Sequence, residues 1–558
     1  MQKEALQRRI DAALGRIPCD LILNNVKFLD VFSCQWNKGS IAVCDGVIVG
    51  IEPGLHAKRT IDGKSKALVP GFIDAHVHVE SSLLIPPYFE KAVLPRGTTT
   101  AICDPHELTN VVGIQGIQYF LEESKKLSLD LRVMLSSCVP ATHLETNGGG
   151  NIDAAMLLPL LSHPKALGLA EMMNVPGVLN KKPDVLEKLI TFSHVPIDGH
   201  CPKVSGQNLS AYAATGISSC HESVELSEAK EKLTKGIAVW IREGSVAKNL
   251  KDLIPLLNPS TSPFIGFCTD DRNPLDIAQE GHIDFLVKGA IAAGVLSETV
   301  YRSASLSVAR HYGLKNIGAI APGYQADFIL LEDVSTCAIH SVYKNGKLAS
   351  ELETKPITKH EHTNTVKAKT PEAKDLEGPK GRVHVMGVKS GSIYTERLVL
   401  DSEDNGIAKL SVLERYGRGS KPANAYVSGF GKNLSGAIAS SVGHDSHNLI
   451  VVGKNTKDMR VALACLIESG GGFCVVQNEK IVETLPLPFG GLMSFEEPRS
   501  VEKQLRKMRQ ASHFIGCELP EPFLQLAFLC LPVIPSLKLT DKGLVDVDRF
   551  QFIDVRVS

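Results

Sequence analysis

Histidines and carboxylates stand at the ends of five apolar segments of this 558-residue chain, each of which has the pattern of a buried strand. The clearest is the run 68–78, in which His76 and His78 are two residues apart. On an extended backbone both imidazoles point to the same face, so one metal ion can bind both. The other four segments end in Glu171, His200, His221 and Asp270. Four histidines and two carboxylates are a ligand set for two adjacent divalent metal ions.

Each of these residues, taken alone, is best explained as a hydrogen-bonded core histidine or as a charge at the end of a strand. All six at strand ends together favour a functional site. Imidazole and carboxylate ligands suit Zn, Fe(II), Mn or Co, and residue type alone does not choose among these metals.

Residues 69–317 have the pattern of a scaffold that would bring these strand ends together. Apolar runs alternate there with helical periodicity, for example in residues 185–190 and 226–233. The predicted strands are 68–76, 98–104, 130–139, 166–172, 195–200, 216–221, 237–242 and 263–270. Eight strand and helix units in about 250 residues are typical of a (β/α)8 barrel, whose chemistry lies at the C-terminal ends of its strands. All six candidate ligands fall at such ends.

The segments on either side of the barrel alternate apolar and polar residues between turn residues, as antiparallel strands do. We therefore predict one small β-sandwich, built from residues 1–68, with an N-terminal helix, and from residues 318–351. The polar, proline-bearing residues 352–380 are predicted to be a linker. Residues 381–558 are predicted to form a further domain. The expected fold class is α/β, with a TIM-like (β/α)8 barrel inserted in a small β-sandwich and a C-terminal α/β domain.

Composition argues against a nucleic-acid-binding, secreted or membrane-spanning protein. The chain is 43% apolar, which suffices for a sizeable core, and its net charge of −1 gives no electrostatic signature of nucleic-acid binding. The 13 cysteines are scattered, as reduced core thiols are, and residues 1–17 lack the apolar region of a secretory signal. No apolar run is long enough to span a bilayer. We expect a cytoplasmic protein that binds neither nucleic acid nor membrane and forms a homo-oligomer, with a dimer as the default.

Several motifs resemble a known family. The run 70–78 and the segment 322–327 look like the amidohydrolase superfamily. Within it, the chain resembles the bacterial and archaeal adenine deaminase family at residues 79–82, 103–107, 168–174, 198–202, 219–223 and 268–272. The resemblance covers nearly the whole chain, because residues 470–473 and 485–494 look like that family's additional C-terminal module. Many relatives in the superfamily carry a carboxylated lysine on the fourth strand, where this chain has Glu171.

This resemblance implies two divalent metal ions per chain, Mn or Fe(II) in the first place, with Zn left open. It implies that His76, His78, Glu171 and Asp270 hold one ion and that Glu171, His200 and His221 hold the other, with a hydroxide between them. The expected catalytic residues are Asp270 and Glu171, and Asp270 would move the proton. The expected substrate is adenine, which is hydrolysed to hypoxanthine and ammonia in purine salvage.

Residues beside these ligands have weaker signals. Glu80 and Ser81, followed by Ser82, would contact the substrate or cap the next helix. Asp271 and Arg272 would contact the substrate or orient Asp270, or else serve as a helix N-cap and a surface charge. Another group would orient metal ligands or bind an additional metal, although strand-end turn chemistry is the preferred explanation for its first three members; this group is Asp104, His106, Glu107 and Glu222.

Three further segments resemble sites but are predicted not to be sites. Residues 443–447, Gly-His-Asp-Ser-His, precede a strand and favour a solvated turn over a ligand set. Residues 360–362, His-Glu-His, favour a solvated charge run in the linker. Residues 429–436 have neither dinucleotide nor phosphate-loop glycine spacing and favour a turn.

Three functions remain to be weighed. The first is adenine deamination. The second keeps the metals but acts on another aminated ring or a cyclic amide, because pocket shape sets the substrate. The third is a scaffold without catalysis, which has no reason to keep every strand-end ligand. A bound-metal assay separates the third function from the first two, and a substrate panel separates these two.

Overall fold

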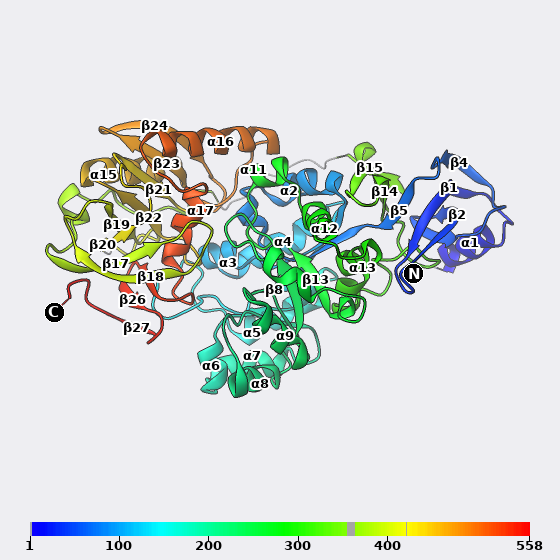
Figure 1. Ribbon diagram of the computed structural model, residues 1–558, viewed down its shortest axis with the longest axis horizontal. Helices are drawn as coiled ribbons and strands as arrows, with labels where there is room; N and C mark the ends of the chain where they lie inside the picture. Colours follow the sequence, from blue (N-terminus) through cyan, green and yellow to red (C-terminus); the bar gives the residue numbers. More distant parts are fainter. Residues whose placement is uncertain (1–2, 354–362, 420, 558) are drawn as a thin grey trace.

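The structure is a computed structural model that describes residues 3–353, 363–419 and 421–557. Figure 1 shows three bodies in a row: an N-terminal sheet (blue, right), a central barrel, and a C-terminal domain (yellow to red, left). The barrel lies in the middle, so each of the other two bodies can contact it.

The central body is a barrel of parallel strands in sequence order. Its strands are β6 (Phe72–Val77), β7 (Thr98–Cys103), β8 (Asp130–Leu135), β9 (Ala166–Met172), β10 (Ile197–Gly199), β11 (Ser219–Cys220), β12 (Ala238–Arg242) and β13 (Ile265–Cys268). The ring closes between β6 and the residues after β13, because Asp270 N donates to His76 O at 3.0 Å and His78 N donates to Asp270 O at 3.2 Å. The predicted (β/α)8 barrel is confirmed.

Helices cover the outside of the barrel, which explains why its strands are largely buried. The longer ones are α2 (Pro86–Val93), α4 (Ile114–Ser124), α7 (Pro183–Thr191), α8 (Gly206–Ala213), α9 (Leu226–Thr234) and α12 (Ile283–Ala292). Every residue of β6, β7, β12 and β13 is buried. Side chains with polar chemistry are therefore exposed to a cavity only where a strand ends.

The segments that flank the barrel form one sheet. Its strands are β1 (Cys19–Asp30), β2 (Gln35–Cys44), β3 (Val47–Gly50), β4 (Ala57–Asp62), β5 (Ala67–Pro70), β14 (Phe328–Asp333), β15 (Ala338–Lys344) and β16 (Lys347–Leu348). Strand β5 pairs with β1 on one side and with β14 on the other, so the barrel is inserted between two neighbouring strands. Helix α1 (Lys3–Ala13) packs against β2 and β3.

The C-terminal domain is built on a second large sheet. Its strands are β17 (Arg382–Val388), β18 (Thr395–Asp401), β19 (Ile407–Leu413), β20 (Ala423–Ser428), β21 (Ala437–Ser440), β22 (Leu449–Gly453), β23 (Gly472–Gln477) and β24 (Lys480–Pro486), with helices α15 (Thr456–Ser469), α16 (Pro498–Phe514) and α17 (Pro522–Ala527). A small sheet, β25 (Leu537–Thr540), β26 (Gly543–Asp546) and β27 (Gln551–Phe552), follows. Residues 429–436 join β20 to β21 as a turn, as predicted.

The C-terminal domain packs over the mouth of the barrel. Ser494 N donates to Leu83 O at 2.8 Å, and Asn448 Nδ2 donates to Thr146 O at 2.8 Å. These hydrogen bonds join residues of the barrel loops to residues more than 300 positions later. The loops at the barrel mouth are therefore covered by the second domain.

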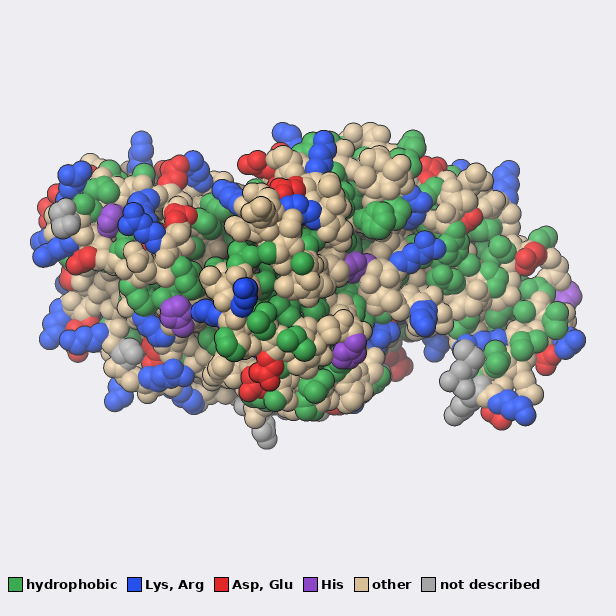
Figure 2. Space-filling view, turned by 90° about the horizontal axis from the view of Figure 1, so that it is seen from below, with side chains coloured by type: hydrophobic (Ala, Val, Ile, Leu, Met, Phe, Trp, Pro, Cys, Tyr) green, Lys and Arg blue, Asp and Glu red, His purple; other side chains and the backbone are tan. Residues whose placement is uncertain are grey.

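The surface does not gather charge of one sign on the face shown in Figure 2, where Lys and Arg side chains alternate with Asp and Glu among the described residues. This distribution agrees with the net charge of −1. Among the described residues, no helix combines the length and apolarity needed to cross a bilayer.

Candidate active site

The six predicted ligands meet at the C-terminal mouth of the barrel. On one side, His76 and His78 approach each other with their Nε2 atoms 3.1 Å apart. Asp270 Oδ1 lies 3.1 Å from His78 Nε2, and Glu171 Oε1 lies 3.3 Å from the same atom. The first two histidines therefore share their surroundings with both carboxylates.

Glu171 also faces the remaining two histidines. Its second oxygen, Oε2, lies 2.6 Å from His200 Nδ1 and 3.4 Å from His221 Nε2. Glu171 thus stands between two groups of histidines, with one carboxylate oxygen toward each. All six side chains are buried.

The arrangement fits divalent cations. His78 Nδ1 lies 3.0 Å from the carbonyl oxygen of Asp104, so this nitrogen donates a hydrogen bond there and Nε2 is the atom that a cation would bind. Two imidazole nitrogens at 3.1 Å, with carboxylate oxygens around them, form a set of donors that a cation would stabilise. Ligand atoms of His76, His78 and Asp270, and of His76, Glu171 and His221, lie within 4.8 Å of one another. His200 Nε2 is buried and makes no hydrogen bond with any residue that the structure describes.

Both carboxylates are ionised in spite of their burial. Burial opposes the charge of Asp270, but hydrogen bonds with His76 and His78 and the charge of Arg242 hold its pKa well below its usual range. Burial also opposes the charge of Glu171, and the charges of His221, His200 and His76 hold its pKa well below its usual range. The site therefore supplies two negative charges to cations.

The sequence analysis assigned no role to Arg242, the last residue of β12. Its guanidinium donates to Asp270 Oδ2 at 2.8 Å and also pairs with Glu222, with one N–H···O bond of 3.1 Å. Arg242 therefore orients the oxygen of Asp270 that faces away from His78. A charged residue at the end of a predicted strand was the signal that could have identified it.

Two of the weaker candidates at the strand ends lie in the pocket. Asp271 contacts the hydroxyl of Ser81, and its pKa is raised by burial and by the charge of Asp270. Glu222 holds Arg242 and lies 3.8 Å from His221 Nε2. These residues are placed to orient the ligands or to contact a substrate.

Two other candidates bond elsewhere. Arg272 donates to Gly281 O at 2.9 Å and to Glu280 at 2.7 Å, so its guanidinium does not reach the pocket. Glu80 accepts from Leu108 N at 3.0 Å, and burial and Glu107 raise its pKa to about 7. Both residues stabilise loops behind the site.

Asp104, His106 and Glu107, which follow β7, are buried beside the pocket. His106 Nδ1 lies 2.9 Å from Asp104 Oδ2, and the other oxygen of this carboxylate, Oδ1, accepts a hydrogen bond from Ser136. His106 and Glu107 begin helix α3 (His106–Val112), and both line the cavity. The Asp104 carboxylate therefore orients the imidazole of His106.

The prediction of a solvated turn at residues 443–447 is wrong. His444 and Asp445 are each only 2% exposed, and His447 is 1% exposed. His444 Nδ1 lies 2.6 Å from Glu107 Oε1, and His447 Nε2 contacts Glu107 Oε2. The loop is polar because it packs against the polar mouth of the barrel. Residues 360–362, predicted to be a solvated charge run, lie outside the described residues.

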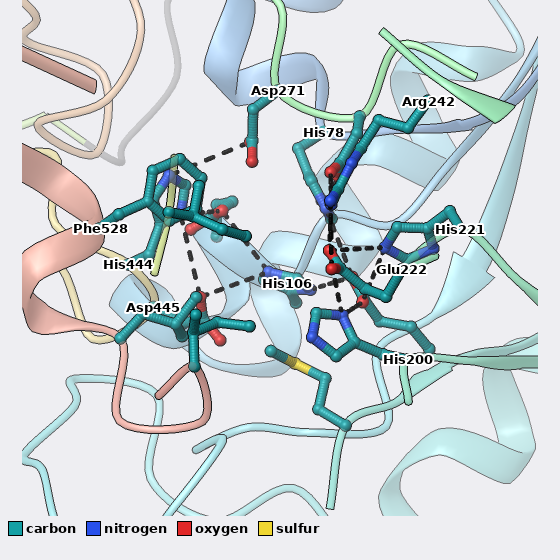
Figure 3. Close-up of a pocket in the computed structure, with 17 residues that line it drawn as sticks. His78, His106, His200, His221, Glu222, Arg242, Asp271, His444, Asp445 and Phe528 are labelled. Carbon is teal, nitrogen blue, oxygen red and sulfur yellow. Dashed lines mark hydrogen bonds and ion pairs between the residues drawn. The ribbon is translucent and has the colours of Figure 1, made fainter. Parts of the chain in front are cut away.

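A pocket lies between the two domains. Figure 3 shows His200, His221, Glu222 and Arg242 on one side of it, His444, Asp445 and Phe528 on the other, and His106 between them. Apolar residues of the C-terminal domain complete the second side; they are Ile393, Phe528, Leu531 and Ile534.

Lys538 supports the apolar side of the cavity. Its buried Nζ donates to Ile393 O and to Phe528 O, both at 2.8 Å. Burial lowers the pKa of Lys538 to about 7, whereas an unfolded lysine titrates near 10.4. The unfolded chain then binds more protons than the folded chain between about pH 7 and pH 10. Burial of Lys538 therefore destabilises the folded chain to its full extent below pH 7, and this destabilisation is lost as the pH rises through the window.

We therefore expect the free energy of unfolding to rise with pH between 7 and 9 by up to about 1.4 kcal/mol per pH unit from this group. Lys538→Met should remove this contribution, and chemical denaturation at both pH values measures it. Lys542→Met, which changes a lysine on the adjacent turn, is the control. Equal pH slopes in wild type and Lys538→Met would contradict the prediction.

The barrel fold and the ligand set are those of a metal-dependent hydrolase, and comparison with known families agrees. Residues 67–349 match the amidohydrolase family, and residues 388–551 match the adenine deaminase C-terminal domain. Adenine deaminase 1 of Rhizobium meliloti (strain 1021) is 46% identical over 99% of this chain and 100% of its own length. The adenine deaminase of Brucella suis biovar 1 (strain 1330) is 44% identical over 98% of this chain and 96% of its own. The chain belongs to the adenine deaminase family of the amidohydrolases.

Proposed function

We propose that this protein hydrolyses adenine to hypoxanthine and ammonia and so acts in purine salvage. The observation that carries the proposal is Glu171, which stands between two pairs of buried histidines at one side of the pocket between the domains. The match of residues 388–551 to the adenine deaminase C-terminal domain supports the choice of substrate, because those residues include the opposite side of the cavity.

We propose two divalent metal ions per chain. His76, His78, Glu171 and Asp270 would hold one ion, and Glu171, His200 and His221 would hold the other. Mn or Fe(II) is our first choice, and Zn suits the same ligands. When bound, divalent metals in such a site lower the pKa of water toward ~7 and so make hydroxide available at neutral pH.

The residues of the chain then position and move protons. Water adds its oxygen to C6 of adenine, the bond from C6 to the amino nitrogen breaks, and ammonia leaves. Asp270 is a carboxylate at the site, so it can accept a proton from the attacking water and deliver it to the ring or to the departing amino group. Arg242 holds Oδ2 of Asp270 in place during this transfer.

Another aminated ring or a cyclic amide is the second candidate substrate class, because the same ligands can serve either reaction. The limited cavity and its buried polar groups favour a small flat base. Ammonia release from adenine, compared with ammonia release from cytosine and guanine and with ring opening of hydantoin under the same conditions, distinguishes the candidates.

Removal of metal should abolish activity. We expect chelator-treated protein to lose ammonia release from adenine and to recover it as about two ions bind per chain, measured by elemental analysis. His200→Ala should lower metal content and activity together. His340→Ala, an exposed histidine on β15, is the matched control. Full activity of the metal-free protein would refute the proposal.

A further inference from the structure

The side of the cavity that faces the metal-ligand residues belongs to the C-terminal domain. We call this side the C-terminal wall and define it by residues His444, Asp445, Phe528, Leu531 and Ile534. Figure 3 shows His444, Asp445 and Phe528 across the pocket from His200 and His221. A molecule that reacts at the metal-ligand side must therefore place its opposite edge against this wall.

His444 is held in one orientation. Its Nδ1 lies 2.6 Å from Glu107 Oε1, so Nδ1 carries a hydrogen and forms an ion pair with the carboxylate. Its ring stacks on Phe528, with centroids 4.7 Å apart. Glu107 is itself fixed by His447, which accepts from Gly443 N through Nδ1 and contacts Glu107 through Nε2.

The other nitrogen of His444 is left without a partner. Nε2 is buried and makes no hydrogen bond within the described residues, and Asp271 Oδ1 lies 4.0 Å away. Burial disfavours the imidazolium, but the charges of Glu107 and Asp271 outweigh burial and raise the pKa of His444 to about 9. Nε2 therefore bears a hydrogen at neutral pH and is a free donor.

Asp445 presents the complementary group. Its Oδ2 is buried and makes no hydrogen bond among the described residues. Burial raises the pKa of this carboxyl to about 6, and the charge of His106 opposes the rise, so the group is a carboxylate at neutral pH. A buried donor and a buried acceptor on neighbouring residues are costly unless a ligand satisfies both.

We propose that His444 and Asp445 recognise the edge of the adenine ring opposite C6, with His444 donating to N3 and Asp445 accepting from N9–H. This inference rests on the proposed function, which places C6 at the metal-ligand side. N3 is an acceptor and the neighbouring N9–H is a donor, so the two match the donor of His444 and the acceptor of Asp445 in the C-terminal wall. Only the free base has a hydrogen on N9, so the C-terminal wall selects adenine over its nucleosides.

The test compares adenine with two analogues that each lack one of these groups. Wild type should lose about 10- to 100-fold in kcat/KM with 3-deazaadenine, which lacks the N3 acceptor, and with 9-methyladenine, which lacks N9–H; this is the range for one hydrogen bond to a charged group. His444→Phe should lose as much with adenine and should no longer discriminate against 3-deazaadenine. Asp445→Ala should behave in the same way toward 9-methyladenine.

Controls separate recognition from folding. His384→Phe changes a histidine of β17 that does not line the cavity, and it should keep the wild-type preferences. His444→Gln retains a donor and should recover part of the activity lost in His444→Phe, mainly through KM. Metal content and thermal unfolding of each variant show whether it is folded and loaded.

The outcomes are distinct. Wild type that releases no ammonia from adenine refutes the proposed function and this inference with it. If wild type deaminates 3-deazaadenine and 9-methyladenine as well as it deaminates adenine, this inference alone is refuted. Unchanged analogue preferences in folded His444→Phe and Asp445→Ala refute it as well, because the discrimination would then arise elsewhere.

Discussion

Asp270→Asn is expected to lower kcat for adenine deamination by on the order of 10²–10⁴-fold, the usual scale for loss of a general acid–base group. The carboxylate lies 3.1 Å from His78 Nε2 and 2.8 Å from a guanidinium nitrogen of Arg242, so an amide of the same shape keeps the position. The amide lacks the negative charge of the carboxylate and cannot carry the proton. Steady-state ammonia release at equal metal content measures the effect.

Asp271→Asn is the matched neighbour and should be milder. Asp271 contacts Ser81 and lies 4.0 Å from His444 Nε2, so its loss should raise KM more than it lowers kcat. If Asp270→Asn kept near wild-type turnover while Asp271→Asn was inactive, the two assignments would have to be exchanged. The order of the two effects is therefore the decisive measurement.

The barrel and the meeting of the six candidate ligands could be predicted because both depend on local pattern. Strands β10 and β11 contain only three and two residues, yet their apolar runs end at His200 and His221 as expected. Parallel strands of a barrel bring their C-terminal ends to one mouth, so strand order alone placed these histidines together. No long-range information was needed for that step.

The C-terminal side of the pocket could not be predicted in the same way. Residues 443–447 are polar and precede a strand, and a local pattern of that kind is typical of a solvated turn. Their burial depends on contacts across the chain, such as that of Asn448 with Thr146, 302 residues earlier. Nothing within a short window of sequence specifies which distant surface covers such a loop.

Arg242 is an intermediate case. Its position at the end of a predicted strand was visible in the sequence, and a charge at that point of a barrel is a candidate for the active site. Its role depends on Glu222 and Asp270, which lie on the neighbouring strand ends on either side. The structure was needed to show that it binds both carboxylates.

Glu171→Gln should lower metal affinity by at least about 10- to 100-fold, the range already seen when only a hydrogen-bonding partner of a ligand is lost. Glu171 directs Oε1 toward His76 and His78 and Oε2 toward His200 and His221, so its charge is shared by both histidine groups. The amide has no net charge, and its nitrogen turns N–H groups toward one group of histidines. Repulsion between cations held there would then be less well compensated.

The measurement is metal content after dialysis against a graded series of chelator concentrations, with ammonia release followed in parallel. Glu187→Gln, which changes an exposed glutamate on α7, is the control for charge removal and should match wild type. Metal loss and activity loss should run together in Glu171→Gln, because a site without its shared carboxylate cannot keep cations on both sides. If Glu171→Gln kept wild-type metal content and rate, the glutamate would serve only to align the histidines. The metal ions would then have to be bound by the four imidazoles and Asp270 alone.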